Sequence, residues 1–118
     1  MAHPNLSDEI NARIDNPERL NDLDVRTIKV GSKVLIHTRN TIYILHRLTE
    51  TNWTVEGHPK FCPTPTPCRF AGSTWGGSMI KVGHLGIGMH MELYLLKGRN
   101  VGPLTTSPIQ RIVRGRSR

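Results

Sequence analysis

Histidine and cysteine are the side chains of this sequence with the richest chemistry, and three of them fall in one short segment. His58, Cys62 and Cys68 follow one another at intervals of three and five residues, and His84 or His90 could supply a fourth ligand. Zn²⁺ prefers such ligands, but structural zinc sites use a tighter pair of cysteines than one separated by three prolines. We therefore predict no metal and no cofactor. Free thiols, a disulfide and metal-bound thiolates all stay open for the two cysteines.

Catalytic groupings find little support in the sequence. Cys62 or Cys68 could be paired with His84 or His90 as a nucleophile and its base, but no spacing requires such a pair. Carboxylates are scarce, since residues 25–118 contain three glutamates, Glu50, Glu56 and Glu92. The sequence therefore favours a protein that is not an enzyme, and a small metal-binding or Cys/His enzyme is the least favoured function.

The segment from Gly72 to Gly88 contains six glycines. Gly76-Gly77-Ser78, together with Lys81, offers amides, a hydroxyl and a cation that could hold a phosphate. However, the dinucleotide glycine spacing is reversed at residues 83–88, and no GKS or GKT follows. These glycines are better explained as corners and bulges between strands.

Charge is divided unevenly along the chain. Residues 1–24 hold six acids and two arginines, a net charge of −4, whereas residues 25–118 hold fourteen Lys and Arg and three acids, a net charge of +11. A basic body attracts polyanions such as nucleic acid, and an acidic arm can cover that body or recruit another protein. The charge pattern therefore indicates binding.

Cations are the candidate contacts to phosphate. The set combines four residues around the first predicted hairpin with four of the C-terminal stretch, which has no acid: Lys29, Lys33, Arg39, Arg47, Arg111, Arg114, Arg116 and Arg118. Aromatic residues make up 5% of the chain, and Trp53 and Phe70 are expected in the core. Phosphate contact is therefore favoured over base stacking. A solvated basic face that keeps the domain soluble is the alternative interpretation.

Two kinds of secondary structure are expected to position these residues. Leu6, Ile10 and Ile14 recur every four residues, which predicts a helix that Ser7 caps and Asn16-Pro17 ends. A second helical turn is predicted over residues 17–23, with Asn16 as its cap.

From Val25 the apolar period changes to two, which is typical of strands. The sequence predicts a hairpin that turns at Arg39-Asn40. His37 and His46 lie on its two strands and are expected to be partly exposed strand residues, with a neighbouring, pH-sensitive pair as the alternative. The predicted strands cover residues 33–38, 42–46, 53–56, 68–71, 79–82, 89–96 and 109–113.

Short motifs within residues 30–113 match a known pattern. They are Gly31, Thr38 with Asn40, Trp75 to Ser78, Gly88 with Glu92, and Thr106-Ser107 with Ile109. With these motifs the chain resembles a set of uncharacterised small bacterial β-barrel domains. The resemblance implies a β-barrel and a bacterial protein, and it implies no activity.

Together these observations predict an all-β fold, a small SH3-like barrel of five to seven short strands with a short N-terminal helix. We divide the chain into an acidic helical arm (1–24), a β-barrel domain (25–113) and a basic tail (114–118). The predicted function is a binding module for the phosphate backbone of RNA or DNA, and the alternative is a protein-interaction adaptor that uses the acidic helix.

No membrane contact is expected, because the apolar stretches span a few residues whereas a membrane span needs about 20. The N-terminus lacks the pattern of a signal or transit peptide, so we expect a cytoplasmic protein. The sequence does not predict its oligomeric state.

Overall fold

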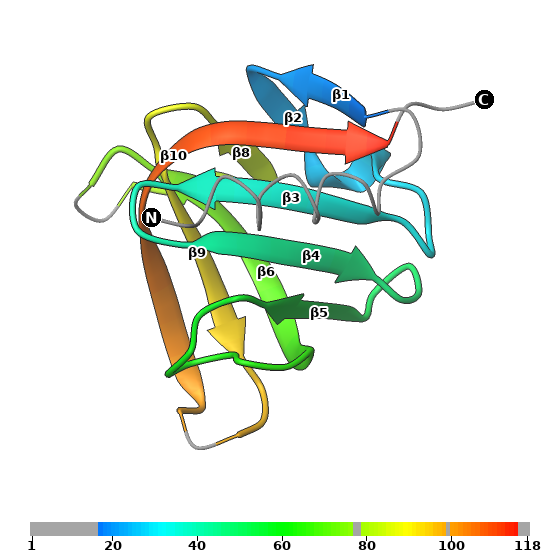
Figure 1. Cartoon of the computed structure of the whole chain (residues 1–118), viewed down its shortest axis with the longest axis vertical. Helices are drawn as coiled ribbons and strands as arrows, with labels where there is room; N and C mark the ends of the chain where they lie inside the picture. Colours follow the sequence, from blue (N-terminus) through cyan, green and yellow to red (C-terminus); the bar gives the residue numbers. More distant parts are fainter. Residues whose placement is uncertain (1–16, 77–78, 99, 116–118) are drawn as a thin grey trace, which may run out of the picture.

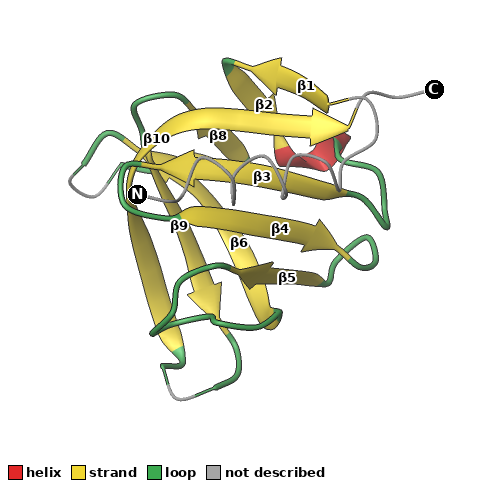
Figure 2. Cartoon of the chain, in the orientation of Figure 1, coloured by secondary structure: helices red, strands yellow, loops and turns green. Residues whose placement is uncertain are grey.

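Ten strands run through the part of the chain that the computed structural model describes, which is residues 17–76, 79–98 and 100–115 (Figure 1). One short 3-10 helix, η1 (Val25–Thr27), is the only helical element among these residues (Figure 2). The predicted all-β fold is therefore confirmed. The strands are β1 (Pro17–Leu20), β2 (Asp22–Asp24), β3 (Lys33–Thr38), β4 (Ile42–Arg47), β5 (Trp53–Glu56), β6 (Thr66–Thr74), β7 (Lys81–Val82), β8 (His84–Gly86), β9 (His90–Leu95) and β10 (Gly102–Gly115).

All strand pairs are antiparallel, and two sheets result. The larger sheet has the order β1-β10-β3-β4-β5-β6-β7, and β9 pairs with both β6 and β10. The smaller sheet pairs β2 with β8. Because β10 pairs with β9 through its first half and with β3 through its second, the path from β10 through β3, β4, β5, β6 and β9 returns to β10.

The main core lies inside this closed path of strands. Alternation along β3 and β4 directs Val34, Ile36, Tyr43 and Leu45 inward, and β5 adds Trp53 and Val55. Leu93, Leu95, Ile109 and Ile112 complete the centre, and each is at most 1% exposed. Burial of one such aliphatic side chain contributes roughly 1.5–3 kcal/mol, so this alternation is the main source of stability.

A second, smaller group of apolar side chains lies on the opposite face of the same sheet. It consists of Leu35, Ile44 and Val113, with Ile42 half-buried against them, and we call it the outer apolar cluster. Leu35 stands opposite Ile44 on β4 and opposite Val113 on β10. The two inner strands β3 and β10 are therefore apolar on both faces.

The predicted hairpin and the strand at residues 53–56 are confirmed, but two strands are longer than predicted. Residues 68–71 are the middle of β6, and residues 109–113 are the second half of β10. The sequence does not predict the first half of β10, because it contains Pro103 and Pro108, and proline cannot donate a hydrogen bond to a neighbouring strand. Pro103 is exposed, and Pro108 lies at an irregularity of the β9 pairing.

The predicted helical turn over residues 17–23 is wrong. Pro17–Leu20 pair with Ile112–Gly115, and Asp22–Asp24 pair with β8. Hydrogen bonds to strands that are distant in sequence outweigh the local preference of proline for the start of a helix. The predicted helix over residues 6–16, together with Arg116 and Arg118, lies outside the described residues.

Two glycines with positive φ provide a matched test of this backbone. Gly57→Ala should lower the free energy of unfolding by about 3 kcal/mol or more, because φ is +135° and a Cβ would collide with the carbonyl oxygen of Ile42. Gly31→Ala should cost only about 1 kcal/mol, because φ is +89° but nothing lies within 4 Å of the added Cβ. Urea denaturation measures both, and equal losses would contradict the close approach at Gly57.

Candidate nucleic-acid interface

A tight turn presents two of the predicted cations. The Ser32 amide donates to the Lys29 carbonyl (3.0 Å), and Gly31 takes the positive φ of +89° that the third position of such a turn requires. The Gly31 amide donates to the Arg47 carbonyl (2.6 Å), which fixes the turn against β4. Lys29 and Lys33 flank this turn, and both are exposed.

Arg47 lies behind this turn and holds it in place. Its Nη1 donates to the carbonyl oxygen of Ile28 (2.7 Å), and its Nη2 donates to that of Glu50 (2.9 Å). The guanidinium also stacks on the buried Trp53, 5.5 Å from the ring centre. These donors are therefore occupied within the protein, where Arg47 holds the turn in place.

The end of β10 brings a third cation to the same place. Arg114 stands opposite Val34, its Nη1 donates to the Thr27 hydroxyl (3.4 Å), and its Nη2 pairs with Glu18 (3.4 Å). In Figure 1 the cyan turn before β3 and the red end of β10 lie on the same side of the molecule. We call the set of Lys29, Lys33 and Arg114 the basic corner.

Arg26 lies close to the basic corner, but its charge is matched. Its Nη2 is 2.7 Å from a carboxylate oxygen of Asp24, and its backbone amide donates to the same side chain. These bonds lower the pKa of Asp24 to about 2. Arg26 is therefore neutralised locally.

The remaining predicted cations do not join the basic corner. Arg39 is exposed in the turn between β3 and β4, at the other end of β3, where its amide donates to the Pro108 carbonyl (3.0 Å). Arg111 is half-buried opposite His37, with its Nη2 3.3 Å from the His37 Nε2. The predicted set is thus spread over three places.

His37 is neutral at physiological pH. Burial lowers its pKa from the ordinary value of 6.5 to about 4, and the charges of Arg111 and Arg19 add to this effect. Its predicted neighbour His46 lies at the other end of the hairpin, opposite Lys33, because the register pairs His37 with Ile42. The two histidines are therefore not neighbours, and both are partly exposed strand residues, as the favoured interpretation expects.

The histidines and cysteines singled out for metal binding are either buried thiols or imidazole rings with hydrogen-bond partners within the protein. Both thiols are free and buried, and burial raises their pKa, to about 12 for Cys68. The His84 Nδ1 lies 3.3 Å from the Ser73 hydroxyl, and the His90 Nδ1 lies 2.7 Å from the Thr106 carbonyl oxygen. Within residues 17–76, 79–98 and 100–115, no group of three or more His, Cys, Asp or Glu could hold a metal ion.

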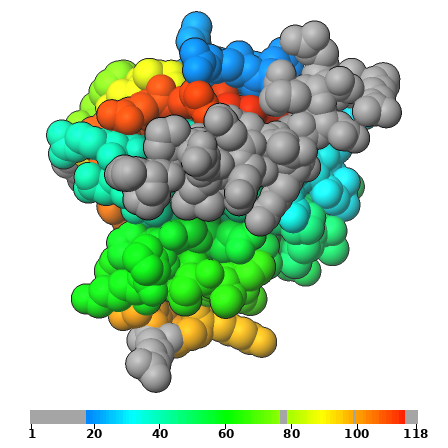
Figure 3. Space-filling model, in the orientation of Figure 1, coloured from blue at the N-terminus to red at the C-terminus, as the bar shows by residue number. Residues whose placement is uncertain are grey.

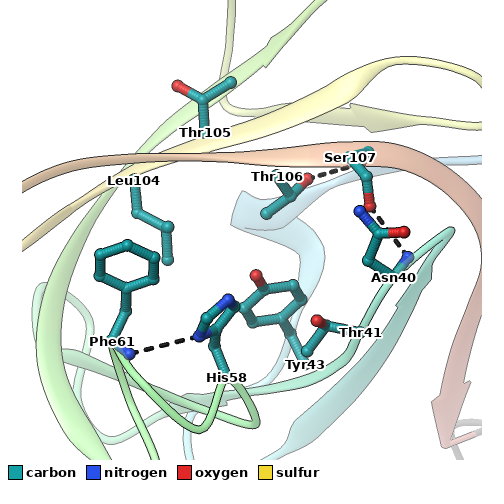
Figure 4. A pocket seen from close by; sticks show the side chains of 9 residues that line it. All are labelled: Asn40, Thr41, Tyr43, His58, Phe61, Leu104, Thr105, Thr106 and Ser107. Carbon is teal, nitrogen blue, oxygen red and sulfur yellow. Dashed lines mark hydrogen bonds between the residues drawn. The ribbon is translucent and has the colours of Figure 1, made fainter.

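A small cavity of about 140 Å³ opens near the tip of the first hairpin (Figure 4). His58 lines this cavity, and its ring centre lies 4.7 Å from the ring centre of Phe61 and 6.5 Å from that of Tyr43. The backbone amides of Lys60 and Phe61 donate to the His58 Nδ1 (3.1 and 3.3 Å). The lining residues are Asn40, Thr41, Tyr43, His58, Phe61, Leu104, Thr105, Thr106 and Ser107. The lining contains neither lysine nor arginine, the residues predicted to contact phosphate.

Exposed apolar residues form a feature that sequence reasoning missed. Trp75 is 72% exposed, Met79 83% and Val82 83%, and all three belong to the glycine-rich segment. The Trp75 ring lies over Gly88, where an added Cβ would be 3.2 Å from it. Gly77 and Ser78, the centre of the predicted phosphate cradle, lie outside the described residues.

Comparison of the chain with protein-family models, with curated proteins and with solved structures finds no match. Among the described residues, the structure contains no helix of the length and apolarity that crossing a membrane requires.

The role of Arg47 predicts a specific loss of stability. Arg47→Lys keeps the charge but cannot reach two carbonyl groups with one planar fork, so it should lower the free energy of unfolding by about 2 kcal/mol. Arg69→Lys is the matched control, since Arg69 is exposed and stacks on Tyr94 at 5.4 Å. It should change stability by less than about 1 kcal/mol. Equal urea midpoints for Arg47→Lys and the parent would contradict the role.

The lowered pKa of His37 predicts a dependence of stability on pH. Between pH 6.5 and about 4 the unfolded chain gains a proton at His37 that the folded chain does not, so stability falls as the pH falls. His37→Gln removes this contribution and should flatten the curve in that window. The parent and the variant are compared by urea denaturation at several pH values, and an NMR titration of the His37 ring near pH 6.5 would contradict the account.

Proposed function

We propose that this chain is a non-enzymatic binding module that contacts the phosphate backbone of RNA or DNA at the basic corner. In this proposal the closed path of strands is a small SH3-like barrel, and Lys29 and Lys33 make the first phosphate contacts. Arg116 and Arg118 extend the same site, because they follow Gly115 at the end of β10.

One observation carries the proposal, namely the register between β10 and β3. It places Arg114 opposite Val34, so the C-terminal arginines continue from the side of the molecule that holds Lys29 and Lys33. In the described part of the chain, the ion pairs are Arg26–Asp24 and Arg114–Glu18, and neither involves the two lysines. Both lysines are exposed, so an incoming anion can reach them.

The chemistry of the corner favours a polyanion over a small anion. Exposed lysines gain little from one contact in water, but several contacts along a phosphate chain release condensed counterions together. Four contacts to a single strand would give a slope of about −3 in a plot of log affinity against log salt. The side chains at the corner read no base, so sequence preference should be weak.

Fluorescence anisotropy with a labelled mixed-sequence RNA 12-mer and a DNA duplex, at several salt concentrations, tests this proposal. Lys29→Ala combined with Lys33→Ala should weaken binding about tenfold and make the salt slope shallower by about 1 to 2. Ending the chain at Gly115 should have a similar effect. Both follow from the loss of phosphate contacts at one site.

Lys81→Ala combined with Lys97→Ala is the matched control, because both lysines are exposed and lie away from the corner. This pair removes the same net charge and should leave the salt slope within error of the parent. Equal losses of RNA affinity for the two pairs of substitutions would show that binding depends on net charge and not on the basic corner. An absence of binding at low salt would overturn the proposal.

A protein-interaction surface is the second candidate, and a separate observation favours it. Trp75, Met79 and Val82 expose large apolar side chains within one segment. Exposed apolar patches of this kind commonly mark sites of protein–protein interaction. This candidate predicts that Trp75→Ser with Val82→Ser leaves RNA binding unchanged while abolishing binding to a purified protein partner. Loss of RNA binding in this variant would instead place nucleic acid on the apolar segment.

A further inference from the structure

The outer apolar cluster is buried more deeply than one sheet layer can explain. Leu35 is 1% exposed, Val113 5% and Ile44 7%, although their described partners in the cluster come from the same three strands, β3, β4 and β10. Side chains that stand together on one face of a sheet shield each other's flanks but leave their ends open. Burial to this degree requires a second layer over the face.

Cations frame this cluster on the same face of the sheet. Arg19 stands opposite Val113, and Arg111 precedes Val113 by two residues, so both share its face. Lys33 and His37 flank Leu35 at the same two-residue spacing, and His37 is neutral at physiological pH. Glu56, opposite Ile44 on β5, is the acid at the far border. The face is therefore an apolar centre with a mainly positive rim.

The N-terminal sixteen residues have the complementary pattern. Leu6, Ile10 and Ile14 recur at a spacing that places them on one face of a helix, and Asp8, Glu9 and Asp15 supply negative charge around it. Ser7 can cap such a helix, and the acids at its first turn suit the helix dipole. An apolar stripe edged by acids matches an apolar centre edged by cations.

Connectivity and length also fit this match. Pro17 opens β1 and pairs with Gly115, so the preceding residues join the sheet at its edge. A helix over residues 7–16 would be about 15 Å long. The distance from β1 across β10 and β3 to β4 is three strand spacings, or about 14 Å. The segment is therefore long enough to cover the cluster.

We propose that the outer face of β3, β4 and β10 is the docking site of residues 6–16 of the same chain, bound as an acidic amphipathic helix. Leu6, Ile10 and Ile14 pack on the outer apolar cluster, and the acids lie beside Arg19 and Arg111. The docked helix supplies the second layer and neutralises part of the sheet's positive charge. This proposal does not depend on nucleic-acid binding.

Paramagnetic relaxation in the full chain tests the docking. A nitroxide is attached after Ala12→Cys, because helical spacing puts position 12 opposite the apolar stripe, while the native thiols are buried with raised pKa and react slowly. Methyl signals of Leu35, Ile44 and Val113 should be strongly attenuated. Those of Leu96 and Val101, next to the turn between β9 and β10, should keep their intensity. In Figure 3 the orange atoms of this turn lie at the lower end of the molecule, whereas β1 (blue) lies at the top.

Two variants and one mixing experiment complete the test. Ile10→Asp should restore the three methyl signals, whereas the matched control Ile10→Leu should leave them attenuated. Mixing a nitroxide-bearing chain with a separate isotope-labelled chain distinguishes a neighbouring molecule, since docking within one chain attenuates nothing in that mixture. The proposal is overturned if the three methyl signals are not attenuated in the singly labelled chain, or if they are attenuated equally in the mixture.

Discussion

The pairing of strand β10 with different partners along its length is the constraint on which the other features depend. Its first half pairs with β9, and its second half pairs with β3 on one side and β1 on the other. Register shifts near Pro108 and between Ile109 and Arg111 let the strand change direction between them. Because one strand serves both halves, Leu104, Ile109 and Ile112 all reach the main core.

The same strand sets the two surfaces to which we assign roles. Arg114 reaches the corner held by Arg47 because it stands opposite Val34, while Val113, one residue earlier, faces the opposite side beside Leu35. Alternation along β10 thus separates a phosphate-contacting edge from an apolar docking face. In our account, the acidic segment covers the flat face of the sheet, and the exposed lysines beside the turn at Gly31 stay accessible.

The sequence predicts the strands that follow from local residue patterns, and it misses the strands that form only by pairing with distant parts of the chain. Alternating apolar residues and the Arg39-Asn40 turn are enough to predict β3 and β4. The strand character of Pro17–Leu20 is not predictable locally, because its partners lie more than ninety residues away in β10. The sequence predicts Arg47 as a phosphate contact, but its two carbonyl partners, Ile28 and Glu50, meet it only in the folded chain. The strand that carries Arg47 is therefore predictable from the sequence, whereas the role of its side chain is not.

Chemical-shift mapping with a short single-stranded oligonucleotide would test the central claim most directly, because it locates the bound phosphate chain on the protein. The account predicts that backbone amide signals of residues 29–33 and 114–115 shift on addition of the oligonucleotide and return as salt is added. Shifts confined to the segment around Trp75, or to the cavity beside His58, would contradict it.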